Sequence, residues 1–234
     1  MMKLVKVYDF TSMTTLDSDW TVEVGEKWAN RELQHYVNDP DHLFLDEAGL
    51  HIRATYQDGI YRSARLNTKG RFAFKEGRID IVATIPGGRG TWVALWLMSD
   101  DQRYGRWPRS GEIDLMEHVG NRPGLVYCCL HTEAYNHTKK DYYYATYTRP
   151  DVVGKPHTYS LIWAEDAITY LLDGTVMARH EKGAEGRLSD QTGWPFDHPF
   201  YLIMNMAIGG NLGGPVSPED FPQTFTIQSI TIKQ

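Results

Sequence analysis

The sequence predicts an all-β fold, a sandwich or jelly roll of two antiparallel sheets, and three observations support this prediction. Short runs of β-type composition recur along the 234 residues, and each ends at Gly, Pro, Asn or Asp. No stretch of 12 or more residues repeats its apolar positions with a helical period. Aromatic residues make up 12% of the chain, which suits a β-rich core and also the aromatic platforms of a binding groove.

The expected strands follow one another along the chain. They cover residues 49–56, 77–88, 91–98, 112–119, 125–132, 157–174, 200–210 and 225–233. Within 157–174, two β-type runs flank a short polar turn, and Asp173-Gly174 after them is a hairpin turn signal. No linker, repeat or low-complexity tract interrupts the pattern, so we expect a single domain over residues 1–234.

Net charge and the distribution of apolar residues limit which partners and which location the protein can have. A formal net charge of −6 argues against nucleic acid and against an anionic membrane surface as partners. No run of about 18 apolar residues predicts a membrane span. The N-terminal sequence MMKLVKVYDFTS has no apolar core of the length that a signal peptide needs, so the chain is either cytoplasmic or has lost its signal.

The two cysteines, Cys128 and Cys129, are adjacent in the sequence. Neighbouring side chains on a strand point to opposite faces, so a disulfide between them would be strained. Without a CxxC spacing, a redox or metal role has little support. We expect two free thiols, one of which is buried as a small apolar side chain.

Three acids lie close together in SGEIDLMEHVG (110–120). Glu112 and Asp114 are two residues apart and therefore share one face of a strand. Glu117 follows Asp114 by three residues and would point to the opposite face if the strand were regular. The broken alternation of the acids needs a structural explanation.

A β-bulge at Leu115-Met116 would restore a common face. The extra residue re-aims the side chains beyond it, so Glu117 rejoins the other acids, with Ile113 and one of the two bulge residues buried behind. Two such carboxyl groups suit retaining glycoside hydrolysis, in which one attacks the anomeric carbon and the other donates a proton to the leaving oxygen. A third acid between them helps one to ionise while the other keeps its proton. The alternative is a polar strand face with three solvated acids, where like charges repel.

The acid segment resembles the catalytic signature of glycoside hydrolase family 16, in the bulged E-x-D-x-x-E form of its laminarinase-like branch. The resemblance extends over nearly the whole chain. Blocks similar to that branch are WANRELQHYVND (28–39), GRIDIVATIPGGRGTWVALWLM (77–98), WPRSGEIDLMEH (107–118), HTYSLIWAEDAITYLLDG (157–174) and PFDHPFYLIMNMAIGGNLGG (195–214). Several independent blocks in the expected order make the resemblance strong.

The resemblance implies a concanavalin A-like β-jelly roll whose inner sheet bends into an open, concave cleft for endo-acting cleavage of a β-glycan. It implies that Glu112 is the nucleophile, Glu117 the acid/base and Asp114 the assisting carboxylate of a retaining mechanism. It also implies a set of sugar contacts. These are Trp107, which would pack on the sugar at the cleavage point, with Asn30, Arg65, Trp96 and His131. Trp96 could equally belong to the core, and Asn30 and Arg65 could be ordinary surface residues.

We expect an endo-β-glucanase that acts on mixed-linkage β-1,3-1,4-glucan (lichenan), on β-1,3-glucan (laminarin) or on both. An endo-β-galactosidase of the same family and a non-catalytic glycan-binding jelly roll are the alternatives. The paired glutamates argue against the second, because a lectin has no use for a nucleophile and an acid. A polysaccharide substrate implies secretion, and we expect a monomer.

Some segments depart from the family pattern. Leu212 stands where many laminarinase-like relatives have an aromatic residue, and we expect GGNLGG (209–214) to be a loop. The three tyrosines of residues 142–144 could either edge the cleft or pack the sandwich.

We expect no cofactor for catalysis, and the sequence names no metal site. His131 and His137 lack a third ligand at a metal spacing. A structural calcium ion is common on the outer face in this family, and acids such as Asp9 could bind it.

Overall fold

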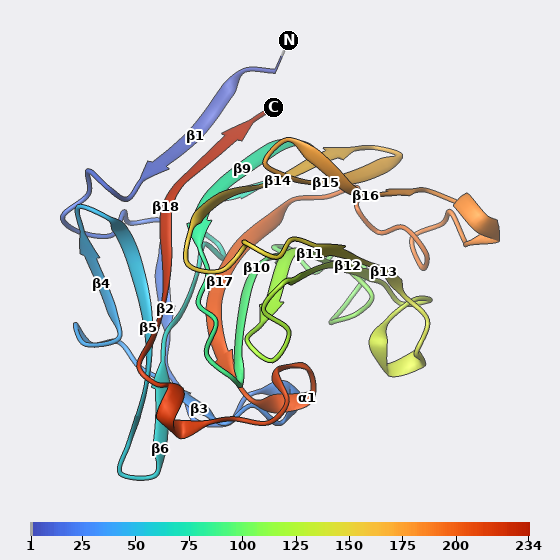
Figure 1. Cartoon of the computed structure of the whole chain (residues 1–234). Coiled ribbons are helices and arrows are strands. Elements are labelled where there is room, and N and C mark those ends of the chain that lie inside the picture. The colour runs from blue at the N-terminus through green and yellow to red at the C-terminus, as the bar shows by residue number, and fades with distance from the viewer. Residues whose placement is uncertain (1) are drawn as a thin grey trace.

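The structure is a computed structural model and describes residues 2–234. Within these residues, two β-sheets pack face to face (Figure 1). The ten-stranded sheet has the order β16-β15-β14-β9-β18-β5-β6-β3, with β1 paired to β18 and β4 paired to β5. Its strands are β1 (Leu4–Asp9), β3 (Gln34–Tyr36), β4 (Leu43–Asp46), β5 (Gly49–Gln57), β6 (Ile60–Ser63), β9 (Gly77–Thr84), β14 (Pro156–Ala164), β15 (Ala167–Leu172), β16 (Thr175–Glu181) and β18 (Gln223–Lys233).

The eight-stranded sheet has the order β13-β12-β11-β10-β17-β7-β2, with β8 paired to β17. Its strands are β2 (Thr21–Glu23), β7 (Arg65–Asn67), β8 (Ala73–Phe74), β10 (Thr91–Ser99), β11 (Glu112–Val119), β12 (Leu125–His131), β13 (Tyr143–Thr148) and β17 (Phe200–Ile208). Short helices connect some strands, namely η1 (Ala29–Arg31), η2 (His137–Lys139), η3 (Ala184–Gly186), α1 (Gly210–Gly213) and η4 (Pro218–Asp220). Strand pairs are antiparallel except β3 with β6, which is parallel. The predicted all-β sandwich of two sheets is confirmed.

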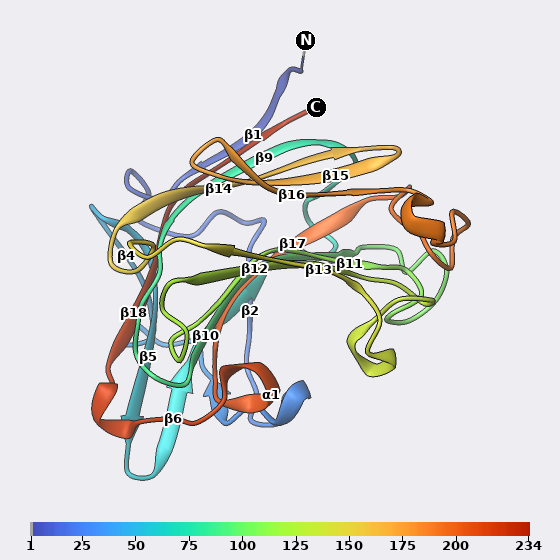
Figure 2. The same cartoon turned by 45° about the vertical axis from the view of Figure 1, so that its right-hand side comes forward.

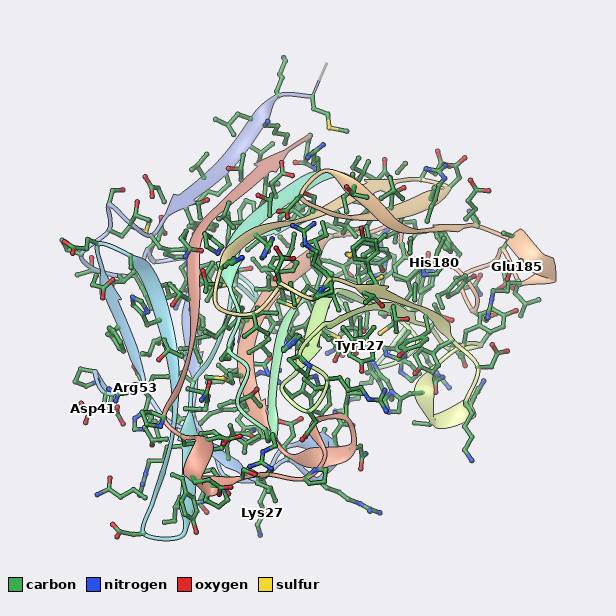
Figure 3. The ribbon with its side chains drawn as sticks, viewed as in Figure 1. Lys27, Asp41, Arg53, Tyr127, His180 and Glu185 are labelled. Atoms are coloured by element: carbon green, nitrogen blue, oxygen red, sulfur yellow. The ribbon has the colours of Figure 1, made fainter. Side chains whose placement is uncertain are left out.

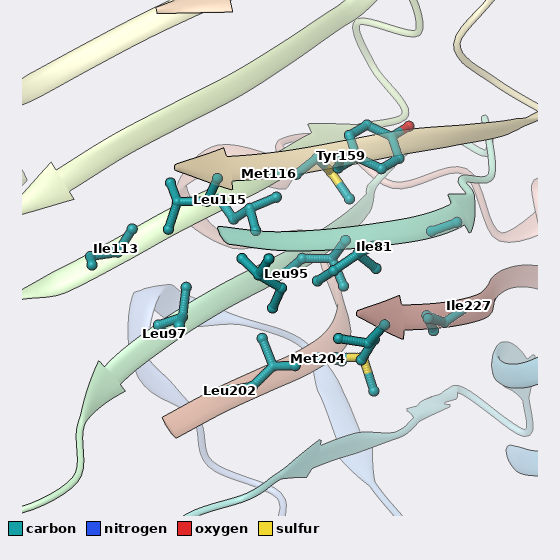
Figure 4. Close-up of a cluster of buried hydrophobic side chains, with 14 of the residues drawn as sticks. Ile81, Leu95, Leu97, Ile113, Leu115, Met116, Tyr159, Leu202, Met204 and Ile227 are labelled. Atoms are coloured by element: carbon teal, nitrogen blue, oxygen red, sulfur yellow. The ribbon is translucent and has the colours of Figure 1, made fainter. Parts of the chain in front are cut away.

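Apolar side chains fill the space between the two sheets. Figure 2 shows β14, β15 and β16 as one layer above β11, β12 and β13. In the close-up of Figure 4, Leu95 of β10, Leu115 of β11 and Met204 of β17 meet Ile81 of β9 and Ile227 of β18, and all five are fully buried. Because side chains of a strand alternate between faces, the other face of β10, β11 and β17 is free to carry polar side chains.

The predicted strand positions are largely confirmed. Each of the eight predicted runs contains at least one strand, β14 pairs with β15, and Asp173-Gly174 forms the turn into β16. The prediction that residues 209–214 form a loop is wrong, because α1 makes one helical turn there. None of the helices in residues 2–234 has the length and hydropathy to cross a membrane.

Both cysteines are free thiols, as predicted, and both are buried. The expectation that only one would be buried is therefore wrong. Alternation along β12 sends the Cys128 side chain into the core, whereas Cys129 points to the opposite face. Cys129 is nevertheless buried there, because Asp114 and neighbouring side chains cover its thiol.

Gly120, directly after β11, provides a test of the packing. A Cβ at this position would lie 1.8 Å from the carbonyl oxygen of Gly88. We expect Gly120→Ala to push these backbone segments apart and to lower the free energy of unfolding by about 1–3 kcal/mol, a fall of several degrees in Tm measured by calorimetry.

Gly124→Ala is the matched control in the same turn. A Cβ on Gly124 would meet its nearest neighbour, Pro150, at 3.4 Å, an ordinary contact. Its stability should therefore change by less than about 0.5 kcal/mol. Equal losses in the two variants would contradict the close approach of Gly120 to Gly88.

Candidate active site

Strand β11 carries a β-bulge at the predicted place. Opposite β12, the register shifts between Asp114 and Glu117, so Leu115 and Met116 together stand against one residue of the partner strand. Both bulge residues are fully buried in the core, so the expectation that only one of them would be buried is wrong. The extra residue brings Glu117 back to the face that Glu112 and Asp114 occupy.

The three acids line an open cleft of about 460 Å³ on the face of the eight-stranded sheet that points away from the core. Strands β10, β11, β17 and β7 form its floor, and the segments around η1, η2 and residue 107 form its rim. Its lining consists of Trp28, Ala29, Asn30, Glu32, Arg65, Trp92, Ala94, Trp96, Met98, Trp107, Glu112, Asp114, Glu117, His137, Asn205 and Ala207.

Four of the five predicted sugar-contacting residues line this cleft, namely Asn30, Arg65, Trp96 and Trp107. Trp96 is therefore a cleft residue and not a core residue. Its indole Nε1 donates a hydrogen bond to Asn205 Oδ1 at 2.7 Å, which fixes the ring against the floor. The Arg65 guanidinium lies 4.9 Å from the Trp96 ring centre, so its charge is directed into the cleft.

His131, the fifth predicted residue, lies beneath the cleft and is not part of its lining. It is 6% exposed, and the rings of His137 and Tyr142 cover it, each with its centre 5.1 Å from the His131 ring. Its Nε2 atom lies 3.4 Å from Asp114 Oδ2. The imidazole that reaches the cleft is that of His137.

Sequence reasoning missed several lining residues, among them Trp28 and Trp92. A signal for Trp92 was available, because it lies four positions from Trp96 in β10 and therefore shares its face. Trp92 Nε1 donates a hydrogen bond to Glu117 Oε1 at 2.8 Å. Trp28 precedes Asn30 in a block whose resemblance was noted, but the contact between its ring and the guanidinium of Arg65 has no local sequence signal.

The three tyrosines of residues 142–144 divide between the two alternatives. Tyr143 is buried in the core of the sandwich, with its ring close to Trp194. Tyr142 stacks on His131, and the half-exposed Tyr144 lies beside Tyr142. They therefore form a wall beside the acids, although neither lines the cleft.

Burial raises the pKa of all three acids. It brings the pKa of Glu112 to about 7, although hydrogen bonding with Asp114 and Trp107 opposes the rise. The pKa of Asp114 is raised well above its usual range by burial and by the charges of the two glutamates. Burial also raises the pKa of Glu117, and hydrogen bonds from Trp92 and Cys129 oppose it. Burial therefore favours the protonated form of Asp114, which can donate a hydrogen bond to Glu112.

No lysine or arginine in residues 2–234 forms an ion pair with any of the three acids. Their one basic neighbour within 4 Å is His131, on Asp114. Burial lowers the pKa of His131 to about 4, so this ring is neutral. The cluster thus combines a proton donor with carboxylates in a site of low polarity, the arrangement that acid/base and nucleophilic chemistry requires.

The sequence alone does not decide whether the protein binds a metal ion. Asp114, Cys129 and His131 place three ligand atoms within 4.8 Å of one another beneath the cleft. Asp9, suggested for calcium, has its Oδ1 occupied by hydrogen bonds from the Thr11 amide and hydroxyl. A structural calcium ion stays a prediction, as does catalysis without a cofactor.

Comparisons with known proteins agree with this geometry. The model of glycosyl hydrolases family 16 matches residues 24–223. Over 226 residues the chain is 38% identical to a β-glucanase from Rhodothermus marinus, covering 91% of this chain and 78% of that protein. The X-ray structure of the laminarinase from Rhodothermus marinus superposes with a TM-score of 0.94 at 35% identity, covering 100% of this chain and 98% of the other. A non-specific endo-β-1,3(4)-glucanase has a TM-score of 0.89 at 31% identity, with 100% and 91% covered.

The raised pKa of Glu112 predicts that its burial costs stability as the pH rises. Between the ordinary value of 4.5 and about 7 the folded state holds more protons than the unfolded chain, so the free energy of unfolding falls across this window. Glu112→Gln abolishes this titration. We expect the variant to exceed the wild type by on the order of 2–3 kcal/mol at pH 8 and to differ little at pH 4, measured by urea unfolding at both pH values.

The control is Glu185→Gln, which makes the same change in charge on the surface. Glu185 is exposed on η3, at the right-hand edge of the molecule in Figure 3. Its variant should follow the wild-type pH dependence. If Glu112→Gln gains no more stability at pH 8 than Glu185→Gln, the burial of an acid with a raised pKa is contradicted.

Proposed function

Because the chain belongs to family 16 of the glycosyl hydrolases, we propose that it cleaves internal bonds of β-1,3-linked and mixed-linkage β-1,3-1,4-glucans with retention of anomeric configuration. The observation that carries the proposal is the set of three acids on one face of the bulged strand β11, at the floor of an open cleft. An open cleft admits the middle of a long chain, which suits an endo-acting enzyme.

In the proposed mechanism Glu112 attacks the anomeric carbon. Its carboxylate is favoured by hydrogen bonding with Asp114 and Trp107 and by the nearby charge of Arg65, all of which oppose the effect of burial on its pKa. The attack forms a covalent glycosyl–enzyme intermediate and expels the leaving sugar. Asp114 moves its proton with the changing charge on Glu112, since the two share a hydrogen bond.

Glu117 is the proposed acid/base. Burial favours its protonated form, which can donate to the leaving oxygen and then accept a proton from the attacking water. The hydrogen bond from Trp92 to Oε1 fixes the orientation of the carboxyl group. Cys129 Sγ lies 2.9 Å from Asp114 and 3.6 Å from Glu117, so it links this group to the middle acid of the row.

The proposed sugar contacts follow from the cleft lining. Trp107 and Trp96 offer aromatic faces to sugar rings, and Asn30 and Arg65 offer polar groups to hydroxyls. His131 lies below the surface, so we propose that it supports Asp114 and does not touch sugar.

Substrate choice is proposed from the named relatives and the cleft. The relatives are described as a β-glucanase, a laminarinase and a non-specific endo-β-1,3(4)-glucanase. These names favour glucans with β-1,3 bonds, and the open cleft gives no reason to exclude chains with additional β-1,4 bonds. A polysaccharide of this kind lies outside cells, so we also propose secretion, and we propose that the protein acts as a monomer.

Reducing-sugar release from laminarin, lichenan, barley β-glucan and a galactan tests the substrate. We expect release from the three glucans and none from the galactan. Glu117→Ala should lower kcat on each glucan by about 10²–10⁴-fold, because it removes the general acid, whereas Glu185→Gln should match the wild type. Release from galactan alone would replace the substrate with a galactoside, and glycan binding without any release would favour the non-catalytic alternative.

Azide separates the roles of the two glutamates. With an activated aryl β-glucoside oligomer, Glu117→Ala can still form the glycosyl–enzyme, so azide should restore turnover and yield the β-glycosyl azide. Glu112→Ala cannot form that intermediate, so azide should attack directly and yield the α-glycosyl azide. Proton NMR of the anomeric signal distinguishes the products, and the reverse pattern would exchange the two roles.

A further inference from the structure

Three potential metal ligands lie together beneath the acids, on the paired strands β11 and β12. Cys129 Sγ is 2.9 Å from Asp114 Oδ2 and 3.6 Å from His131 Nε2, and the latter two atoms are 3.4 Å apart. All three side chains are more than nine-tenths buried, with exposures of 4% for Asp114, 3% for Cys129 and 6% for His131. Glu117 Oε2 lies 3.6 Å from the same sulfur.

We propose that this cluster binds Zn²⁺, with Asp114, Cys129 and His131 as its three protein ligands. Zinc binds nitrogen and oxygen at about 2.0–2.1 Å and sulfur at about 2.3 Å in a tetrahedron, so its ligand atoms lie roughly 3.3–3.6 Å apart. Two of the three separations among the proposed ligand atoms already have these values. The distance between Cys129 Sγ and Asp114 Oδ2 is the one that must increase, by about 0.6 Å on the same tetrahedral estimate.

The donor set fits zinc better than calcium or magnesium. Thiolate and imidazole are ligands for zinc, whereas the harder cations take oxygen atoms almost exclusively. The polar contacts of the His131 ring among residues 2–234 all belong to the cluster, because Nδ1 has no partner and Nε2 faces the sulfur and the carboxylate. The ring is therefore buried and aimed at the proposed ion.

The charges of the site favour a dication. Buried carboxylates are normally paired with a cation or bound to a metal, and no lysine or arginine in the part of the chain that the structure describes forms an ion pair with these acids. Zn²⁺ would enter through the cleft, since Asp114 and Glu117 line it. On binding, the Cys129 thiol and the Asp114 carboxyl group each lose a proton to solvent, and no oxidation state changes.

In the described part of the chain His131 Nδ1 has no hydrogen-bond partner, and this lowers the affinity expected of the site for Zn²⁺. Ligating imidazoles ordinarily donate their other N–H to an acceptor, and loss of that bond weakens metal binding about 10–100-fold. The bound ion should therefore exchange with a chelator. While it is present it binds Asp114, the carboxyl group between the two glutamates, so it acts as a reversible inhibitor of the enzyme.

Cobalt spectroscopy of the chelator-treated full chain tests the proposal, with Co²⁺ as a probe that adopts zinc geometry. We expect one Co²⁺ per chain, with a thiolate-to-cobalt charge-transfer band in the near ultraviolet and the intense visible bands of a tetrahedral ion. Zn²⁺ should displace it. Absence of the charge-transfer band in the wild type overturns the proposal, whatever the variants do.

The adjacent cysteines provide matched variants with one thiol each. Cys129→Ser should lose the charge-transfer band and weaken Zn²⁺ binding at least tenfold in calorimetric titration. Cys128→Ala alters the core face of the same strand and should keep both the band and the affinity. A band that survives in Cys129→Ser, or that disappears in Cys128→Ala, places the ion elsewhere and overturns the assignment.

Activity gives a second readout. Zn²⁺ should inhibit glucan hydrolysis by the wild type and by Cys128→Ala, and the chelator should restore it, whereas Cys129→Ser should need at least tenfold more Zn²⁺. Unchanged sensitivity in Cys129→Ser contradicts the site. Failure of the proposed glucanase function would appear as no hydrolysis by the metal-free protein and would leave the cobalt spectrum unaffected.

Discussion

The burial of three carboxyl groups without a lysine or arginine partner is the constraint on which the site depends. A buried carboxylate is costly unless it is neutralised or hydrogen-bonded, and here protons and donors take the place of a counter-charge. Burial favours the protonated form of Asp114, and Trp92 and Cys129 donate to Glu117. The arrangement that weakens the fold at neutral pH is therefore the one that supplies the proposed acid and nucleophile in the same cleft.

Side chains around the cleft hold its aromatic residues in place through hydrogen bonds and contacts with a guanidinium group. Asn205 accepts a hydrogen bond from Trp96 and donates one to the fully buried Tyr36, so the ring of Trp96 is tied to the core. The guanidinium of Arg65 lies about 5 Å from the rings of both Trp28 and Trp96, and it also pairs with Glu23. Side chains held in this way keep their geometry before a ligand arrives, which reduces the entropy lost on binding.

The sequence predicted most of the strands and the row of three acids. The features that it did not predict have physical causes. Local alternation located the strands and the bulge, because both depend on residues a few positions apart. The bulge buries two residues because Leu115 and Met116 both reach the core, which alternation alone does not anticipate. The place of His131 beneath His137 and Tyr142 depends on the course of the loop after β12. The contact of Cys129 with Asp114 requires the pairing of β11 with β12, which no spacing within one strand reveals.

The bulge also fixes how far apart two of the acids stand along β11. Substitution at Leu115 or Met116 by a similar apolar residue keeps the number of residues between Asp114 and Glu117 and therefore keeps the acids in phase. Deletion of one residue in this interval would remove the bulge and leave a regular strand, in which Glu117 stays on the face of Asp114 but moves one residue closer to it. The bulge therefore sets the spacing of these two carboxyl groups along β11, and replacement of its side chains leaves that spacing unchanged.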